Sequence, residues 1–457
     1  MTTSTATFDQ LSRRFQADFQ ARLPQHIGRL QWDGRQVATH QRDRLRLLLA
    51  HAMQHSPFHS RRLAGIDPQR FELEDLASLP VMTKAEMMAN FDDVLTDRRL
   101  NRSAVDAYIA SAGPLPELLL DDYACLTSGG SSGVRGLFVY GWDAFLDVTL
   151  AVLRPSIARM LASAGSVPPG LVLGLVAAPT AIHMTRAASV LADGGMTTIV
   201  SAPATLPVQE IVKRLNQGNP QVLIGYAGAI RMLAAEQAAG RLAIRPIAIG
   251  TTSEQLTPEA ASAISAAFGV PVANMFGSSE GLIGSSEPGA DTITFASDLA
   301  IAEPVDEDYR PVPPGRPSAR VLVTSLCNFA QPLIRFEMED SFVQQPGRPA
   351  NGHFCATVQG RSDEALVYGG RAFHPLVIRA LLNRNASVFE YQVRQTPDGV
   401  DVSVVTSGPL DEAELSEQLA GALEGAGLSG ARVSMRSVNQ LERQPQTGKV
   451  RRFVPLT

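Results

Sequence analysis

A run of glycine and serine residues is the first stretch of this sequence that could bind a ligand. Residues 126–139 read LTSGGSSGVRGLFV, with four glycines and three serines. Such a run either joins two parts of the chain loosely, or its backbone N–H groups converge on an anion while its hydroxyls supply further donors. A linker would have polar neighbours, whereas this run lies between apolar ones. It lacks the GK[ST] ending of a Walker A loop. The pattern therefore favours a phosphate-binding loop of another type.

Later stretches place polar side chains directly after apolar runs, where strands should end. NMFGSSE at 274–280 offers an aromatic ring to stack on a purine, hydroxyls for a phosphate and a carboxylate for Mg²⁺. GTTSEQLTPE at 250–259 and LIRFEMED at 333–340 have the same arrangement. QGRSDEALVYGGRAFHP at 359–375 and RQPQTGKVRRF at 443–453 add basic residues near glycines.

With the glycine-rich run, these stretches resemble the motifs of the adenylate-forming superfamily: acyl- and aryl-CoA synthetases, luciferases and the adenylation domains of peptide synthetases. The stretch LLLAHAMQHSPFHSRRL at 47–63 is typical of the branch of phenylacetate-CoA ligase, and the likeness covers nearly the whole chain. The resemblance implies ATP-dependent activation of a carboxylic acid, an aryl or arylacetic acid in this branch, as acyl-AMP. The acyl group would then pass to the thiol of coenzyme A, so that ATP, Mg²⁺ and coenzyme A are implied as cofactors.

The resemblance also gives a role to each residue that matches a motif. Phe276 would lie against the adenine, Ser279 would contact the α-phosphate and Glu280 would bind the metal ion. Asp340 would accept hydrogen bonds from both ribose hydroxyls, and Arg361 would assist at the ribose and phosphate. The nucleotide-binding residues that it implies are Ser128, Gly129, Gly130, Ser131, Ser132, Gly133, Gly250, Thr251, Thr252, Ser253, Phe276, Gly277, Ser279, Asp340 and Arg361.

Near the end of the chain, the resemblance implies a moving part. Lys449 would reach the α-phosphate and the acyl carboxylate during adenylation, and Asp363 would be the hinge of a small domain. Gly369 and Gly370 carry no side chains and would leave room for a narrow thiol channel.

Two motifs depart from the family pattern. The phosphate loop has an extra glycine and lacks the usual Pro-Lys ending, so Arg135 would have to supply the positive charge, with a forked geometry unlike that of lysine. Met338 and Glu339 replace the family's Thr-Gly pair. Two alternatives therefore stay open: transfer to an amine or a carrier-protein thiol, and a catalytically reduced nucleotide-binding or regulatory protein. The retained Glu280 and Lys449 favour an active ligase.

The acyl pocket of this branch lies between the helix after residues 176–186 and the turn at 225–230. His183 and Tyr226 could line that pocket, or they could be a satisfied buried histidine and a core tyrosine. The small residues beside Tyr226 leave room for a ring or a modest chain; they are Ala227, Gly228 and Ala229.

Alternating segments predict the scaffold that positions these residues. Residues 1 to about 65 have helical periodicity. From about 120 to 290, apolar runs bounded by Gly, Pro or Ser alternate with amphipathic helices, which is typical of parallel strands covered on both faces. We predict an α/β fold with a large N-terminal domain over 1–361, largely helical up to 120, whose mostly parallel sheets are flanked by helices. A small, mobile α+β domain over 362–457 would follow.

Composition excludes several functional classes. The chain has 457 residues, too many for one compact core, and a net charge of −5 without a basic stretch, which disfavours a nucleic-acid partner. Residues 1–19 contain no apolar core of signal-peptide length, and no apolar run approaches about 20 residues, so we expect neither a signal peptide nor a membrane span. Its three cysteines lack metal or disulfide spacing, and His353 with Cys355 would not complete a zinc shell. We expect a cytoplasmic protein; a homodimer is compatible with the branch.

Overall fold

The computed structural model describes most of the chain. The described residues are 7–127, 136–166, 170–178, 181, 183–195, 197–204, 206, 208–346, 351–361, 366–369, 371–373, 378, 381–382, 385, 387–406, 408–425, 427–443 and 450–456. Among them, no helix combines the length and the apolar character that crossing a membrane requires.

The N-terminal segment is helical, as predicted. α1 (Phe8–Arg29) and α2 (Gly34–His55) each begin at a capping box, in which the side chain of Thr7 or Asp33 accepts from the backbone of the third helical residue. α2 buries a leucine stripe at helical spacing, which fixes its face toward the core. The elements that follow are α3 (Pro57–Arg62), η1 (Leu73–Ser78), α4 (Lys84–Ala89), α5 (Phe91–Val94) and α6 (Arg102–Ser111).

A nine-stranded sheet forms the centre of the large domain, in the order β13-β14-β9-β8-β7-β6-β5-β3-β4. The strands from β4 to β7 pair in parallel, and those from β7 to β13 pair antiparallel. The parallel half confirms that the apolar runs form parallel strands. The sheet becomes antiparallel after β7, because the chain turns back there to form β8. The bounds are β3 (Leu171–Val176), β4 (Thr197–Ser201), β5 (Val222–Tyr226), β6 (Ala248–Thr252), β7 (Val272–Gly277), β8 (Ile283–Ser286), β9 (Ile293–Phe295), β13 (Asp340–Gln344) and β14 (Cys355–Arg361).

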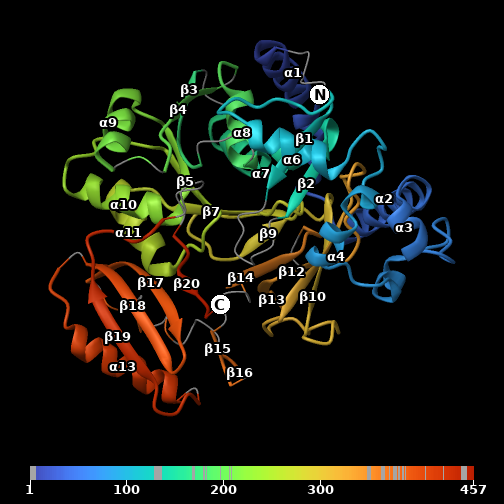
Figure 1. The fold of residues 1–457 in the computed structure, drawn as a ribbon. Helices are drawn as coiled ribbons and strands as arrows, with labels where there is room; N and C mark the ends of the chain where they lie inside the picture. Colours follow the sequence, from blue (N-terminus) through green and yellow to red (C-terminus); the bar gives the residue numbers. More distant parts are fainter. Residues whose placement is uncertain are drawn as a thin grey trace.

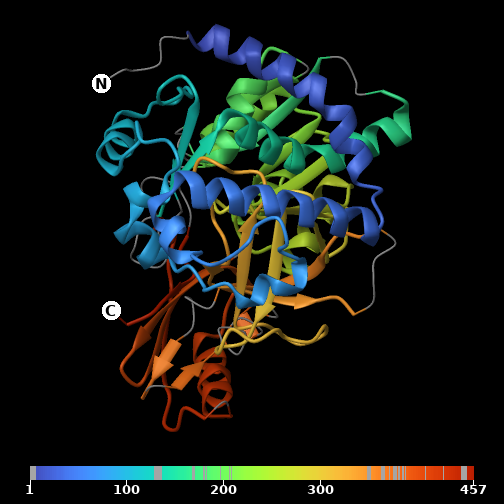
Figure 2. The same ribbon diagram turned by 90° about the vertical axis from the view of Figure 1, so that its right-hand side faces the viewer.

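Helices cover the two faces of the parallel half differently (Figure 1). α9 (Val208–Gly218), α10 (Ala227–Ala238) and α11 (Pro258–Phe268) lie on one side and share a core with the strands. α7 (Trp142–Ala164) and α8 (Met184–Ala192) lie on the other side, where α1 packs against both. Figure 2 shows α1 at the end of the molecule opposite the small C-terminal domain.

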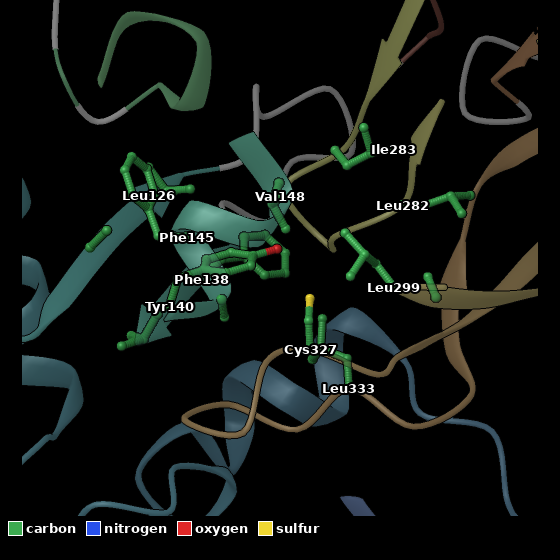
Figure 3. Packing of buried hydrophobic residues seen from close by; sticks show 14 of the residues in the cluster. Leu126, Phe138, Tyr140, Phe145, Val148, Leu282, Ile283, Leu299, Cys327 and Leu333 are labelled. Carbon is green, nitrogen blue, oxygen red and sulfur yellow. The ribbon is translucent and has the colours of Figure 1, made fainter. Parts of the chain in front are cut away.

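A hairpin and a second sheet complete the large domain. β1 (Tyr123–Thr127) and β2 (Leu137–Gly141) pair antiparallel, with Thr127 opposite Leu137. β10 (Ala300–Val305), β11 (Arg320–Ser325) and β12 (Phe336–Met338) form a three-stranded sheet. Figure 3 shows side chains of the hairpin meeting those of α7 and of the turn before β8, so the hairpin is held by the largest core of the protein.

The C-terminal residues form a small α+β unit with a core of its own. Its hairpin turns at TPDG, with Thr396 opposite Gly399, and a Gly-containing turn of this kind is typical of hairpins. The bounds are β15 (Leu366–Tyr368), β16 (Arg371–Phe373), β17 (Val388–Thr396), β18 (Gly399–Thr406), α13 (Glu412–Gly425), β19 (Arg432–Ser437) and β20 (Phe453–Val454). This unit contacts the large domain at α10, where the Arg231 guanidinium donates to the Val388 carbonyl at 2.9 Å.

Candidate functional site

The carboxyl ends of β6 and β7 bring two of the predicted motifs together. The strands are parallel neighbours with Thr251 opposite Asn274, and the Thr251 hydroxyl donates to the Asn274 side-chain oxygen at 3.2 Å. The Met275 methyl packs closely against Gly250: a Cβ added at Gly250 would lie only 2.9 Å from that methyl. Ser253 follows β6 with φ +64° and is exposed. Both motifs therefore end at the same edge of the sheet, where ligands of such sheets bind.

The turn after β7 is tied to the end of β1. The Ser279 hydroxyl donates to the Thr127 carbonyl at 3.4 Å, and the Tyr140 hydroxyl donates to the Ser279 carbonyl at 2.7 Å. Thr127 is the last described residue before the glycine-rich run, and it lines the same cavity as Ser279 and Glu280.

The ribose motif reaches the same place. The Ser278 hydroxyl lies 3.9 Å from the Met338 sulfur, which joins the turn after β7 to the end of β12. Asp340 opens β13 and is only 7% exposed. Its partner across the antiparallel ladder is Arg361, the last residue of β14. The two residues expected to serve the ribose are thus neighbours in space although 21 positions (361 − 340) separate them in the sequence.

Glu280, the residue expected to bind the metal ion, is a buried carboxylate at the cavity. Its side chain is 8% exposed and faces a cavity together with Ser279 and Asp340. Burial raises the pKa of the nearby Tyr140 hydroxyl, to which Cys327 and the charge of Glu280 add. No group of three or more His, Cys, Asp or Glu side chains among the described residues could hold a metal. One carboxylate fits Mg²⁺, which is commonly held by one or two carboxylates plus substrate phosphates.

Most of the described predicted residues line one cavity of about 1090 Å³. They come from β5, β6, the turn after β7, the start of β13 and the start of α8: His183, Tyr226, Gly250, Thr252, Ser253, Phe276, Gly277, Ser279, Glu280 and Asp340. Thr251, Ala227 and Gly228 are not among its lining residues. Gly228 faces another way: its N–H donates to the Glu254 carboxylate at 2.7 Å.

Phe276 is half-buried and fixed at its edges. It contacts Phe295 and Phe342, each with ring centroids 5.5 Å away and nearly perpendicular planes. The ring also lines the cavity, so a planar base could stack on it.

Tyr226 is a buried tyrosine that also lines the cavity. Its hydroxyl oxygen accepts from the Ala178 N–H at 3.0 Å, which ties the end of β5 to the segment after β3. Burial raises the pKa of Tyr226, as does the charge of Glu254, so the phenol stays neutral. Its ring lines the cavity, and so does the half-buried His183 at the start of α8.

Several predicted residues lie outside the described part of the chain: Ser128, Gly129, Gly130, Ser131, Ser132, Gly133, Arg135, Asp363, Gly370 and Lys449. Conversely, the sequence analysis missed Tyr140, whose hydroxyl positions Ser279, and Phe15 and Phe19, which line the cavity from α1. The residues of β2 before Gly141 are all buried, and nothing in that run marks the Tyr140 hydroxyl as the donor to Ser279. Phe15 and Phe19 stand four residues apart in the sequence, but this spacing does not show that they line a cavity.

His353 and Cys355 have other partners than a metal. His353 accepts from the Ser297 N–H at 3.2 Å through Nδ1 and contacts the Arg29 carbonyl at 2.8 Å through Nε2. The Cys355 sulfur lies 3.3 Å from the Thr294 hydroxyl. Both side chains serve as connections between segments.

Comparison with known proteins identifies the fold. No protein-family model and no curated protein matches the sequence. A structure of 2-hydroxyisobutyryl-CoA ligase in the postadenylation state with 2-HIB-AMP aligns with a TM-score of 0.69 at 19% identity, over 93% of this chain and 91% of that one. The same ligase in the thioesterification state, with 2-HIB-AMP and CoA, aligns with a TM-score of 0.55 at 19% identity, over 93% and 91%.

Two further structures align with a smaller share of the chain. ATP-bound MatB from Rhodopseudomonas palustris aligns with a TM-score of 0.51 at 19% identity, over 70% of this chain and 65% of that one. The amide bond synthetase McbA from Marinactinospora thermotolerans gives 0.51 at 14% identity, over 70% and 66%. The chain therefore has the fold of the adenylate-forming ligases.

Proposed function

We propose that this chain is an adenylate-forming ligase of the phenylacetate-CoA ligase branch, which activates a carboxylic acid with ATP and transfers the acyl group to coenzyme A. The supporting observation is the convergence of four separate stretches at one end of one cavity: residues 123–127, 250–253, 274–280 and 338–340. The resemblance favours an aryl or arylacetic acid, which would lie beside Tyr226.

In the first half-reaction, a carboxylate oxygen would attack the α-phosphorus in line, and pyrophosphate would depart. Two anions must meet, so positioning and charge neutralisation would account for most of the rate enhancement, and no nucleophilic side chain is needed. The backbone donors of residues 128–133 and the Lys449 ammonium group would stabilise the charge on the phosphate oxygens. Arg135 would take the place of the missing loop lysine.

The described residues supply the remaining contacts to ATP. Asp340 would accept from the ribose hydroxyls, with Arg361 beside it in the ladder. Phe276 would stack on the adenine. Glu280 would hold Mg²⁺, which, when bound, would offset negative charge on the phosphates.

In the second half-reaction, the small domain would turn about Asp363, withdraw Lys449 and bring residues 368–371 to the site. The thiol of coenzyme A would then attack the acyl-adenylate carbonyl, and AMP would leave. The better alignment with the postadenylation state than with the thioesterification state, 0.69 against 0.55, supports assigning the present domain arrangement to the first half-reaction.

Transfer to an amine or to a carrier-protein thiol is the second candidate. The likeness to an amide bond synthetase supports it, because that fold also serves amide formation. The two candidates share the adenylation step and differ only in the acceptor.

Acid-dependent exchange of labelled pyrophosphate into ATP tests the shared step. We expect exchange with at least one member of a panel of aromatic and aliphatic acids, and none without Mg²⁺. Mass spectrometry with coenzyme A, amines or a carrier protein then identifies the acceptor. If no acid in a broad panel supports exchange, a nucleotide-binding or regulatory protein becomes the better hypothesis.

A further inference from the structure

The cavity that holds the predicted nucleotide residues continues along the whole length of the parallel strands. Val222, Ile224 and Tyr226 are the first, third and last residues of β5, and all three line it. Alternate residues of a strand face the same side, so the cavity follows one face of the sheet from end to end. At about 3.3 Å per residue, the distance from Val222 to Tyr226 is roughly 13 Å.

The neighbouring strands show the same extension. Leu171 and Leu173 of β3, and Ala273 and Met275 of β7, also line the cavity. At the far end, Ile247 lines it and is 59% exposed, so the cavity reaches the surface on the side away from the nucleotide residues.

Helices α7 and α8 cover this face without filling it. Ala188 and Ala192 lie one turn apart on α8, and Val152 and Leu153 lie on the facing side of α7; all four line the cavity and are only half-buried. The small side chains of Ala188 and Ala192 thus leave space between α8 and the sheet.

The opposite face of the same strands is tightly packed. Leu223, which lies between Val222 and Ile224 in β5, belongs to the core shared with α9–α11 and is 0% exposed, whereas Ile224 is half-buried. A parallel strand is normally covered on both faces, and protein interiors are close-packed. An apolar space of this extent loses packing contacts in the empty protein, so its occupant is expected to be an apolar ligand group.

We propose that the acid activated here carries an elongated apolar tail of the fatty-acid type, which lies between the sheet and helices α7 and α8. This proposal rests on the proposed function and revises its substrate class. The carboxylate would lie at the polar end, near Ser279 and Glu280, and the tail would pass Ile224 toward Val222. A single ring would fill only the part near Tyr226, whereas the lining continues along β5 to Val222 and reaches Ile247.

Chain-length selectivity tests the proposal. The wild-type protein is assayed for pyrophosphate exchange with phenylacetic, butanoic, octanoic, dodecanoic and hexadecanoic acid. We expect kcat/KM to rise at least tenfold from butanoic to dodecanoic acid, and to exceed that for phenylacetic acid. A preference for phenylacetic or butanoic acid overturns the proposal and leaves the proposed function intact.

Substitutions along α8 should shorten the accepted tail in steps. α8 runs from the polar end toward the far end, so Ala188 lies nearer the carboxylate than Ala192. Ala192→Phe should reduce kcat/KM at least tenfold for hexadecanoic acid only, and Ala188→Phe for dodecanoic acid as well, with butanoic acid unaffected. Ala188→Leu serves where the phenylalanine variant does not fold. The matched control is Ala263→Phe, an exposed residue of α11 on the other face. Equal losses for all acids would contradict a tail in this space.

Direct binding separates failure of this inference from failure of the proposed function. If no acid supports exchange, the proposed function fails, and the cavity is then probed with the fluorescent fatty acid cis-parinaric acid. Binding that dodecanoic acid displaces, and that Ala188→Phe weakens at least tenfold, keeps the cavity assignment. Absence of binding overturns it.

Discussion

The hydroxyl of Ser279 donates a hydrogen bond to the backbone carbonyl of Thr127, 3.4 Å away across 152 positions of sequence. This contact joins the turn after β7 to the strand from which the glycine-rich run departs. Thr127, from the glycine-rich stretch, and Ser279, from residues 274–280, are therefore in contact, and both line the cavity. The predictions below test what this arrangement does.

Glu280→Gln should raise the Mg²⁺ concentration that pyrophosphate exchange requires. The substitution keeps the shape of the side chain and removes its charge, and loss of a group that supports a metal commonly costs 10–100-fold in metal affinity or activity. We expect a shift of about tenfold or more in the Mg²⁺ dependence. Glu307→Gln, at an exposed position, is the control. An unchanged Mg²⁺ dependence would show that Glu280 does not hold the metal.

Lys449→Ala should impair adenylation alone. By analogy with the loss of one oxyanion donor, the transition state should lose about 2.7–4 kcal/mol. Pyrophosphate exchange should collapse, whereas thioester formation from a supplied acyl-adenylate should survive. Lys213→Ala, an exposed lysine of α9, is the matched control. Equal loss of both half-reactions would refute the division of labour between them.

Tyr140→Phe should loosen the turn that carries Ser279 and Glu280. It removes the donor to the Ser279 carbonyl at 2.7 Å, in a side chain that is 1% exposed. A buried acceptor left without a partner costs about 1–3 kcal/mol. Denaturant unfolding should report this loss, and the KM for ATP should rise. If stability falls while the KM for ATP is unchanged, Tyr140 supports the core and not the site.

Arg154→Leu should destabilise the large domain severely. Arg154 donates to both oxygens of Asp298, at 2.6 and 2.8 Å, and both side chains are almost fully buried. Burial opposes ionisation, yet the Arg154 hydrogen bonds hold the pKa of Asp298 below its ordinary value. Breaking one side of a buried pair costs about 3–5 kcal/mol. A loss of under about 1 kcal/mol in denaturant unfolding would contradict this assignment.

Acid should destabilise the fold partly through His59. Burial lowers the pKa of His59 to about 3, while its Nε2 contacts the Pro332 carbonyl at 2.9 Å. The unfolded chain binds this proton near pH 6.5 and the folded chain only near pH 3, so stability is lost as pH falls through that window. The full loss is about 5 kcal/mol at 1.36 kcal/mol per pKa unit. His59→Gln should flatten unfolding free energy against pH between pH 6.5 and 4; an unchanged slope would assign the acid sensitivity elsewhere.

Local signals predicted the elements better than they predicted their contacts. The helical periodicity of residues 1–65 predicted α1 and α2, because that pattern repeats within four residues. The apolar runs at β3–β7 predicted parallel strands, and the motifs that hold Gly250 and Phe276 lie at the carboxyl ends of β6 and β7.

The depth of the cavity could not be predicted in this way. The alanines near Tyr226 suggested space for a ring, whereas the observed space depends on Ala188, on the face of β5 and on Phe15 of α1. These residues are far apart in the sequence, and no short-range pattern relates them. The Tyr140 contact escaped for the same reason, since a hydroxyl in an apolar strand indicates no partner.

The contact between Arg231 and the Val388 carbonyl has a consequence for turnover. This hydrogen bond joins one side chain to one backbone carbonyl. The proposed rotation of the C-terminal unit would break it, and each return would form it again. The strength of this hydrogen bond would then affect how long the protein stays in each of the two proposed domain arrangements. A weaker bond would favour the arrangement of the second half-reaction over that of the first.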